Sequence, residues 1–229
     1  MYIVEREFHG RTLRIESGRI AKQAAGAALV TYGESMVLVT ACYGAEKDAD
    51  FFPLTVDYVE KTYAAGKIPG SFFRREGKLS EKETLVSRLI DRPVRPLFPE
   101  GFHREVQVVA TVLSADDQND TDVLAMCGAS AALTVSELPF EGPLAGVRVA
   151  RVNGKLLINP MLSQLQNAEL NFILAGTKDA IVMVEGGAHE VPESEVLEAL
   201  FYAHEQLQVI NEMQVELRSK LGKPKMEFK

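Results

Sequence analysis

Residues 71–95, with the sequence SFFRREGKLSEKETLVSRLIDRPVR, say the most about how this chain folds and what it binds. Phe72 and Phe73 stand directly before Arg74 and Arg75, and glycines flank the four. Guanidinium groups bind phosphates through two parallel hydrogen bonds, and aromatic rings stack on unpaired bases. We therefore predict that these four residues, together with Lys78, contact single-stranded nucleic acid. Core aromatics beside solvated arginines are the alternative interpretation.

The second half of the stretch predicts a helix that anchors this basic segment. Ser80 and Glu83 form a Ser-x-x-Glu capping box, which is typical of a helix N-terminus. The apolar residues of 85–90 recur at helical spacing, and Asp91-Arg92-Pro93 is expected to end the helix. The basic segment would thus project from a rigid element.

The flanking sequence alternates between apolar and polar residues, as β-strands do. Strands are expected at residues 12–15, 27–32, 36–40, 54–59 and 106–113. The last of these is apolar enough to lie inside a sheet. Residues 122–137 predict a helix rich in alanine and glycine, which would pack closely on the sheet.

A second unit begins near Gly146. Asn153-Gly154 predicts a hairpin of strands 147–152 and 155–158, and further strands are expected at 171–175 and 180–184. A long amphipathic helix follows, beginning at Pro192 and ending at Gly222. Strands followed by helices, twice over, predict an α+β fold in which helices pack on a mixed β-sheet. The expected lobes are residues 1–145 and 146–229.

Long motifs in the chain resemble the polynucleotide phosphorylase family of bacteria. The motifs are residues 70–78, 88–99, 126–133, 185–188 with 191–193, and 204–206. The resemblance extends from the first strand to Gly222-Lys223-Pro224. It implies a ribonuclease PH-like core domain made of the two lobes.

The resemblance also implies an activity and partners. Members of the family carry two such cores in tandem, a helical linker, and KH-type and OB-fold RNA-binding modules, so we expect this chain to be the first core of a longer enzyme. That enzyme degrades single-stranded RNA from the 3′ end in the cytoplasm, using phosphate to release nucleoside diphosphates. The implied partners are the second core, a homotrimeric ring and an RNA-degradation complex. The implied channel residues are Phe72, Phe73, Arg74, Arg75 and Lys78.

The resemblance places the phosphate-binding loop of active cores before the helix at 122–137, where free backbone N–H groups favour an anion. Here that loop reads ADDQNDTD over residues 115–122, and its aspartates would repel phosphate. Asp120 and Asp122 are suited instead to cap the helix. Asp116 and Asp117 are not expected to form an acid–base pair, because neighbours along a strand point to opposite faces.

Active cores also bind a divalent metal through four acidic residues, which the resemblance aligns with Ser163, Leu165, Glu169 and Asn171. A single carboxylate is a poor ligand set for Mg²⁺. We therefore expect no catalytic residue and no metal site in this chain. Mg²⁺ and phosphate would bind to the second core of the full-length enzyme.

The composition narrows the remaining possibilities. A net charge of −7 confines any nucleic-acid contact to a local surface. No apolar run approaches the roughly 20 residues of a membrane span. Cys42 and Cys127 have no metal-ligand spacing, which predicts two buried thiols in a reducing cytoplasm.

Two other functions are alternatives to a role as the first core of a longer enzyme. The chain could be a stand-alone, non-catalytic ribonuclease PH-like scaffold subunit of an exosome-like ring. It could also be a small-molecule enzyme that uses the acidic loop, but the sequence shows no convergent donor groups for that chemistry.

Overall fold

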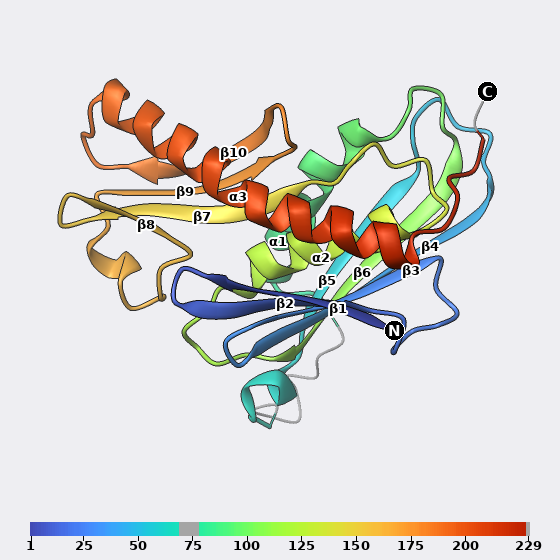
Figure 1. The fold of residues 1–229 in the computed structure, drawn as a ribbon, viewed down its shortest axis with the longest axis horizontal. Coiled ribbons are helices and arrows are strands. Elements are labelled where there is room, and N and C mark those ends of the chain that lie inside the picture. Colours follow the sequence, from blue (N-terminus) through green and yellow to red (C-terminus); the bar gives the residue numbers. More distant parts are fainter. Residues whose placement is uncertain (69–77, 228–229) are drawn as a thin grey trace.

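The structure is a computed structural model, and it describes residues 1–68 and 78–227. In this part of the chain, two β-sheets enclose one helix while two more helices lie against them (Figure 1). The elements are β1 (Tyr2–Phe8), β2 (Arg11–Ser17), β3 (Gly26–Tyr32), β4 (Ser35–Glu46), β5 (Leu54–Glu60), η1 (Thr62–Ala65), α1 (Glu81–Val94), η2 (Arg95–Leu97), β6 (Arg104–Ser114), α2 (Thr121–Val135), β7 (Ala145–Val152), β8 (Lys155–Ile158), η3 (Leu165–Asn167), β9 (Leu170–Gly176), β10 (Ile181–Ala188) and α3 (Glu193–Leu221).

The first sheet has the strand order β1-β2-β3-β4-β6-β5. Its first four strands form an antiparallel meander, and the strands expected at 27–32 and 36–40 are confirmed as the paired β3 and β4. β6 pairs antiparallel with β4 and parallel with β5, so the sheet is mixed. Parallel neighbours need a crossover connection, and α1 lies within the connection from β5 to β6.

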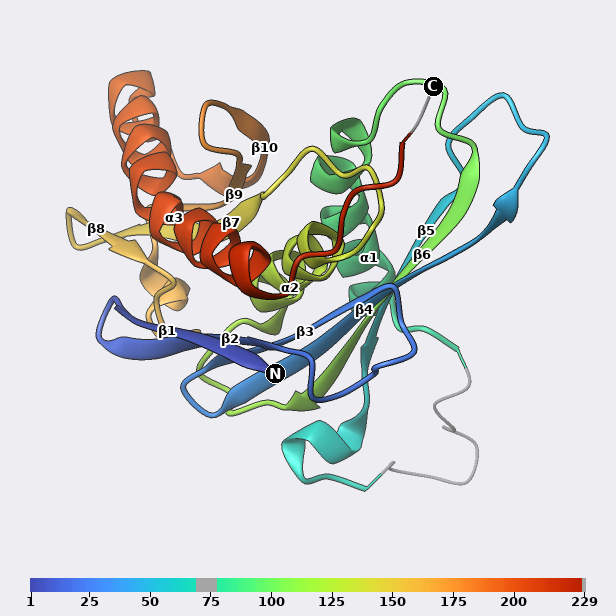
Figure 2. The same ribbon diagram turned by 45° about the vertical axis from the view of Figure 1, so that its right-hand side comes forward.

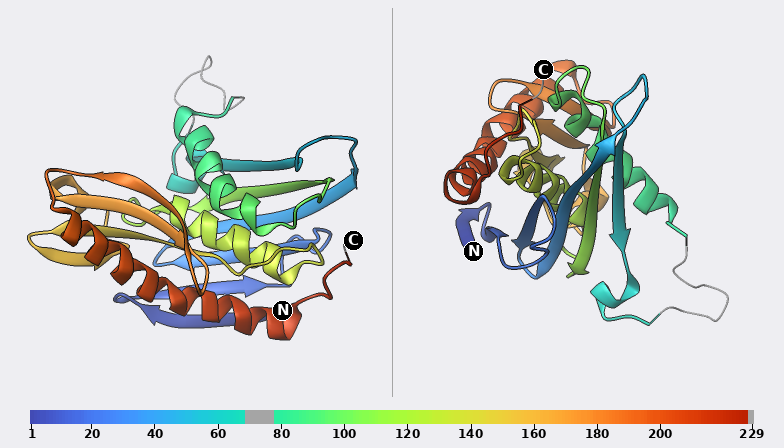
Figure 3. Two further views of the ribbon diagram at one scale, coloured as in Figure 1. Left: turned by 90° about the horizontal axis from the view of Figure 1, so that it is seen from above. Right: turned by 90° about the vertical axis from the view of Figure 1, so that its right-hand side faces the viewer.

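The second sheet has the order β10-β9-β7-β8, and its strands pair antiparallel. The long helix α3 contacts β7 and β9 of this sheet and then reaches β1 of the first (Figure 2). Pro192 precedes its first turn and Gly222 follows its last, as predicted. Seen from above, α3 and the second sheet lie on one side of α2 (Figure 3).

Helix α2 forms the centre of the core, and every one of its residues is buried. It contacts β3, β4, β7 and α3. A Cβ atom on Gly128 would lie 2.5 Å from Cγ2 of Val39, so only glycine permits this approach to the sheet. The close packing predicted from the alanine and glycine content is confirmed, as is the α+β class.

Three expectations were wrong in detail. α1 does not end at residues 91–93 but includes Pro93, because Pro93 and Val94 are buried in the core. Cys127 is buried, but Cys42 is exposed, since it begins the half of β4 that lies outside the core. The last strand does not end at residue 184 as expected, because β10 continues to Ala188 and includes Gly186 and Gly187.

Candidate nucleic-acid interface

The N-terminus of α1 carries the predicted capping box. The Ser80 Oγ accepts a hydrogen bond from the Glu83 backbone N–H at 3.2 Å, and Glu83 Oε2 accepts one from the Ser80 N–H at 2.6 Å. The other carboxylate oxygen of Glu83 accepts from the backbone N–H of Glu60 at 2.8 Å. Glu83 is only 7% exposed, so these bonds lie in a largely dry environment.

Helix α1 also covers the outer edge of β5, the last strand of the first sheet. Ser87 Oγ accepts from the Tyr58 N–H at 2.9 Å. Directly after α1, at the first residue of η2, the Arg95 guanidinium donates to the carbonyls of Phe52 and Leu54 at 2.7 and 3.1 Å. The polar line of α1 consists of Glu83, Ser87 and Asp91 with the C-cap Arg95, whose guanidinium lies 2.8 Å from the Asp91 carboxylate. Its four-residue spacing matches one face of a helix.

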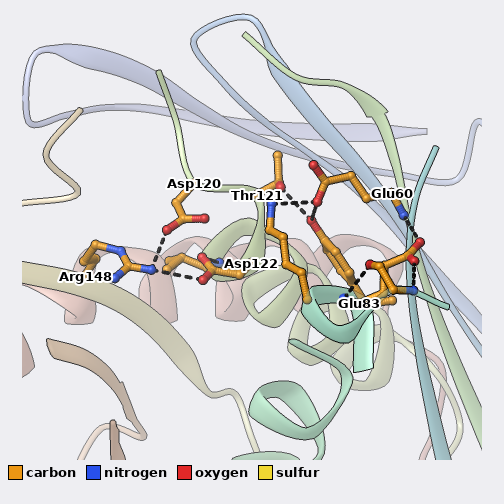
Figure 4. A network of polar contacts seen from close by, with 10 residues as sticks. Glu60, Glu83, Asp120, Thr121, Asp122 and Arg148 are labelled. Carbon is orange, nitrogen blue, oxygen red and sulfur yellow. Dashed lines mark hydrogen bonds and ion pairs between the residues drawn. The ribbon is translucent and has the colours of Figure 1, made fainter. Parts of the chain in front are cut away.

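A chain of polar contacts continues from Glu60 towards the start of α2 (Figure 4). The Glu60 carboxylate accepts from Lys82 Nζ at 2.8 Å and from the Tyr58 hydroxyl at 3.0 Å. The same hydroxyl lies 2.6 Å from Oγ1 of Thr121, the first residue of α2. The two helix N-termini are thus joined through buried Tyr58.

Hydrogen bonds and an ion pair stabilise the charged forms of Glu83 and Lys82 at the start of α1. Burial alone would raise the pKa of Glu83, but the backbone N–H groups of Ser80 and Glu60 outweigh it and lower the pKa. Burial would lower the pKa of Lys82, but its hydrogen bond and ion pair with Glu60 raise it. Both side chains are therefore charged at neutral pH.

Of the predicted RNA-binding residues, Phe72, Phe73, Arg74 and Arg75 lie outside the described residues. Lys78 is described, and it is exposed two positions before the N-cap Ser80. On the other side of the segment, Lys61 directly follows β5. Basic residues therefore stand at both described ends of this segment.

The start of α2 differs from the prediction. Asp120 is the N-cap residue, but its side chain makes no capping hydrogen bond. Asp120 Oδ2 and Asp122 Oδ2 both accept from Nη2 of Arg148 on β7, the second at 3.0 Å (Figure 4). Arg148 also donates to Asn171 on β9 at 3.0 Å. The capping prediction is therefore confirmed only in part: Asp120 stands at the N-cap and Asp122 Oδ1 accepts from the Val123 N–H, but the Asp120 carboxylate binds the guanidinium supplied by the second sheet instead of a helix N–H.

The two aspartates share one cation in a buried place. The Asp122 side chain is 9% exposed, and that of Arg148 is 12% exposed. Burial and the neighbouring Asp120 raise the pKa of Asp122, and Arg148 offsets only part of this rise. The arrangement presents carboxylates, not free donors, at the place where the resemblance puts a phosphate.

Asp116 has a structural role in the loop before α2 rather than a catalytic one. Its carboxylate accepts from the N–H groups of Gln118 and Asn119 at 2.9 and 2.8 Å. Burial opposes ionisation, but these hydrogen bonds prevail and lower the pKa of Asp116 to about 2. Asp116 and Asp117 lie after β6 ends, so the strand argument used for them does not apply.

The four positions aligned with metal ligands do not fit a Mg²⁺ site. Glu169, their one carboxylate, lies 3.5 Å from Arg151 and accepts from the Gly154 N–H. Asn171 accepts from Arg148, while Ser163 and Leu165 offer no carboxylate. Across residues 1–68 and 78–227, no cluster of three or more His, Cys, Asp or Glu side chains could hold a metal ion.

Arg148, Tyr58 and Glu60 had not been singled out from the sequence. Arg148 and Arg151 do interrupt an apolar run in strand 147–152, and a charge on a buried strand signals a partner. Nothing local to the sequence identifies that partner. Tyr58 and Glu60 have ordinary strand spacing and carry no comparable signal.

Two models of one protein family match the sequence of this chain, one over the first sheet and one over the second. Residues 9–139 match the 3′ exoribonuclease family, domain 1, and residues 142–206 match domain 2 of that family. The chain resembles a polyribonucleotide nucleotidyltransferase of Heliobacterium modesticaldum, with 54% identity over 99% of this chain and 32% of the relative. The enzyme of the same name from Nitratidesulfovibrio vulgaris is 56% identical over 95% of this chain and 29% of the relative.

A solved structure shares the fold. It is described as the Archaeoglobus fulgidus exosome with RNA bound to the active site. The TM-score is 0.68 at 20% identity, over 91% of this chain and 88% of that one. The chain thus spans about a third of the length of the curated relatives it matches but nearly all of this structural neighbour. None of the helices in the described part has the length and apolar character that crossing a membrane requires.

Proposed function

Because this chain belongs to the 3′ exoribonuclease family, we propose that it serves as a core domain of a phosphorolytic 3′-to-5′ exoribonuclease. The observation that carries this proposal is the 54% identity with a polyribonucleotide nucleotidyltransferase over 99% of the chain. The ribonuclease PH-like fold, with its mixed first sheet and long C-terminal helix, agrees with it.

Within that enzyme, we propose that the chain is the first and catalytically silent core. Asp120 and Asp122 occupy the start of α2, and the metal-aligned positions hold one carboxylate, which supports silence. Residues 1–145 and 146–229 would be its two lobes. A second core domain of the same polypeptide would bind Mg²⁺ and phosphate, and the enzyme would act as a cytoplasmic homotrimer within an RNA-degradation complex.

The same proposal assigns single-stranded RNA to Phe72, Phe73, Arg74, Arg75 and Lys78. Replacing Arg74 and Arg75 by alanine should weaken RNA binding across sequences and flatten the log-affinity against log-salt slope by about 1.4, or roughly 0.7 for each phosphate contact. The matched control is Lys178→Ala, which removes an exposed charge from the β9–β10 turn. Unchanged affinity and slope in the double variant would refute the RNA assignment.

An activity assay tests whether this core is catalytically silent. The chain is incubated with single-stranded RNA, phosphate and Mg²⁺, and nucleoside diphosphate is measured. We expect no release, whereas a full-length polyribonucleotide nucleotidyltransferase releases it under the same conditions. Sustained turnover by the chain would contradict the silent assignment and leave the family membership intact.

A further inference from the structure

The outward side of α3 carries a row of exposed apolar side chains. Leu197, Phe201 and Val215 are 52%, 66% and 53% exposed. They follow one another after four and fourteen residues, about one and four helical turns, so they lie on one line along the helix. In Figure 1, α3 crosses the near face of the molecule in front of the second sheet. The row does not serve the fold, because α3 packs on the core through other residues, namely Ala199, Ala203, Leu207, Ile210, Met213 and Leu217.

An acidic row runs beside the apolar one. Glu198, Glu205 and Glu212 are exposed and seven residues apart, and none of them forms an ion pair with a described residue. By contrast, the two glutamates of α3 that reach β7 and β1 each bind an arginine at 2.6 Å. The carboxylates beside the apolar row are therefore the ones that this part of the chain leaves without a counter-charge.

The gap between Phe201 and Val215 is filled by Gln208, whose amide is satisfied within the chain. Its Nε2 donates to the Thr177 carbonyl at 3.2 Å and to the His204 carbonyl at 3.1 Å. A partner can therefore cover the whole row without leaving this donor unpaired. Phe201, Gln208 and Val215 recur every seven residues, the same interval as in the acidic row. This shared interval is typical of a helix that pairs with another helix.

We propose that the outward side of α3 is a docking surface for an amphipathic helix that carries lysines or arginines beside its apolar stripe. The proposal does not depend on the proposed function. A helix matches the seven-residue interval of both rows, and basic side chains supply the missing counter-charges. A second copy of α3 does not fit. An antiparallel pair would set the two acidic rows against each other, and a parallel pair would set the acidic row against residues that are already buried, such as Leu207 and Gln214.

The test uses two fluorescent synthetic peptides of about 21 residues, each with leucine along one stripe of its heptads. One peptide carries lysine on both flanks of the stripe and the other carries glutamate, and these like charges keep each peptide from pairing with itself. Fluorescence anisotropy measures their binding to this chain. We expect the lysine peptide to bind saturably, with lower affinity at higher salt, and the glutamate peptide not to bind. No binding of the lysine peptide, or equal binding of both peptides, would overturn the proposal.

Phe201→Ala tests the apolar row, with Phe51→Ala as the matched control. The two phenylalanines are 66% and 64% exposed, but Phe51 lies in the loop before β5, away from α3 in the sequence. We expect Phe201→Ala to weaken binding of the lysine peptide about tenfold, because aromatic anchors dominate such interfaces. Phe51→Ala should leave the affinity unchanged. An equal loss in both variants would mean that the peptide adheres to any exposed aromatic side chain, and the proposal would fail.

Charge reversal tests the acidic row. The double variant Glu205→Lys with Glu212→Lys should bind the glutamate peptide in place of the lysine peptide. The control, Glu7→Lys with Glu141→Lys, makes the same change of net charge at exposed positions elsewhere and should still prefer the lysine peptide. An equal reversal in the control would reduce the effect to net charge and overturn the proposal. A dimer of the wild-type chain in sedimentation that Phe201→Ala abolishes would also overturn it, since a second copy would then occupy the surface.

Discussion

The N-termini of α1 and α2 both carry acidic side chains, yet they use them in opposite ways. At α1, the Glu83 carboxylate accepts from two backbone amides, which lower its pKa. At α2, Asp120 and Asp122 share the guanidinium of Arg148, and burial together with Asp120 raises the pKa of Asp122. The difference teaches that burial and the neighbouring charges and amides, not the helix terminus, decide whether a carboxylate is stabilised in its charged form.

The opposite pKa shifts give opposite dependences on pH. Glu83 has a folded-state pKa below its ordinary 4.5, so its contribution to stability is present above that pH and is lost as the pH falls. Asp122 has a folded-state pKa above its ordinary 3.8. Its contribution is therefore greatest below that pH and is lost as the pH rises through the raised value.

Removing the shared cation should have the largest effect on this comparison. Arg148→Ala leaves the buried Asp122 and the partly buried Asp120 without their counter-charge, so we expect the free energy of unfolding at neutral pH to fall by about 3–5 kcal/mol. Denaturant unfolding measures it. The control is Arg6→Ala, which breaks an ion pair whose arginine is 50% exposed and should cost at most about 1 kcal/mol. Equal losses in the two variants would mean that the acidic pair does not depend on Arg148.

Glu83→Gln should have the next largest effect. Loss of a hydrogen bond to a charged, buried carboxylate is expected to lower the free energy of unfolding by about 1.5–3 kcal/mol at neutral pH. The difference from the wild type should shrink as the pH falls below 4.5 and through the lowered pKa of the folded-state carboxylate. Unfolding curves at a series of pH values measure both. A difference that stays constant down to pH 3 would show that the charge of Glu83 is irrelevant.

Ser80→Ala tests the capping half of the α1 terminus. The variant loses the hydroxyl that accepts from the Glu83 N–H but keeps both carboxylate bonds, so the expected cost is about 1 kcal/mol. Thermal unfolding measures it, with Ser80→Thr as the conservative control that retains the hydroxyl. A loss as large as that of Glu83→Gln would place the main stabilisation in the hydroxyl.

Asp122→Asn changes the pH dependence of stability rather than removing a stabilising contact outright. Asparagine cannot ionise, so the decline of stability as the pH rises above 3.8 should become shallower. The same series of unfolding curves measures it, with Asp179→Asn in the exposed β9–β10 turn as the control. A steeper decline in Asp122→Asn would mean that the carboxylate is stabilised in its charged form.

How far the sequence predicts these sites depends on the distance between partners along the chain. Ser80 and Glu83 are three residues apart, and their capping box is readable and confirmed. Asp120 and Arg148 belong to different units of the fold, so helix-capping rules chose the wrong role for the aspartate. The bond between Glu83 and Glu60 likewise joins two elements and leaves no local signal.

The fold follows the same rule. Alternating strands, the Asn153-Gly154 hairpin and the close packing at Gly128 are local patterns, and all three are confirmed. The continuation of α1 through Pro93 depends on the packing of its last turn against other elements. The sequence of the helix alone does not reveal that packing. Phe72 to Arg75, the residues with the clearest functional signal, lie outside the described part of the chain and stay a prediction.

The polar line of α1 along β5 has a consequence for how this chain meets other chains. An edge strand with unpaired amides and carbonyls is a template for strand addition, which leads to aggregation. Here Glu83, Ser87 and Arg95 take up the amides of Glu60 and Tyr58 and the carbonyls of Leu54 and Phe52. Side chains of α1 and its C-cap thereby satisfy outward-facing backbone groups along the outermost strand of a mixed sheet. A strand of another chain therefore finds no free partner groups along this part of β5.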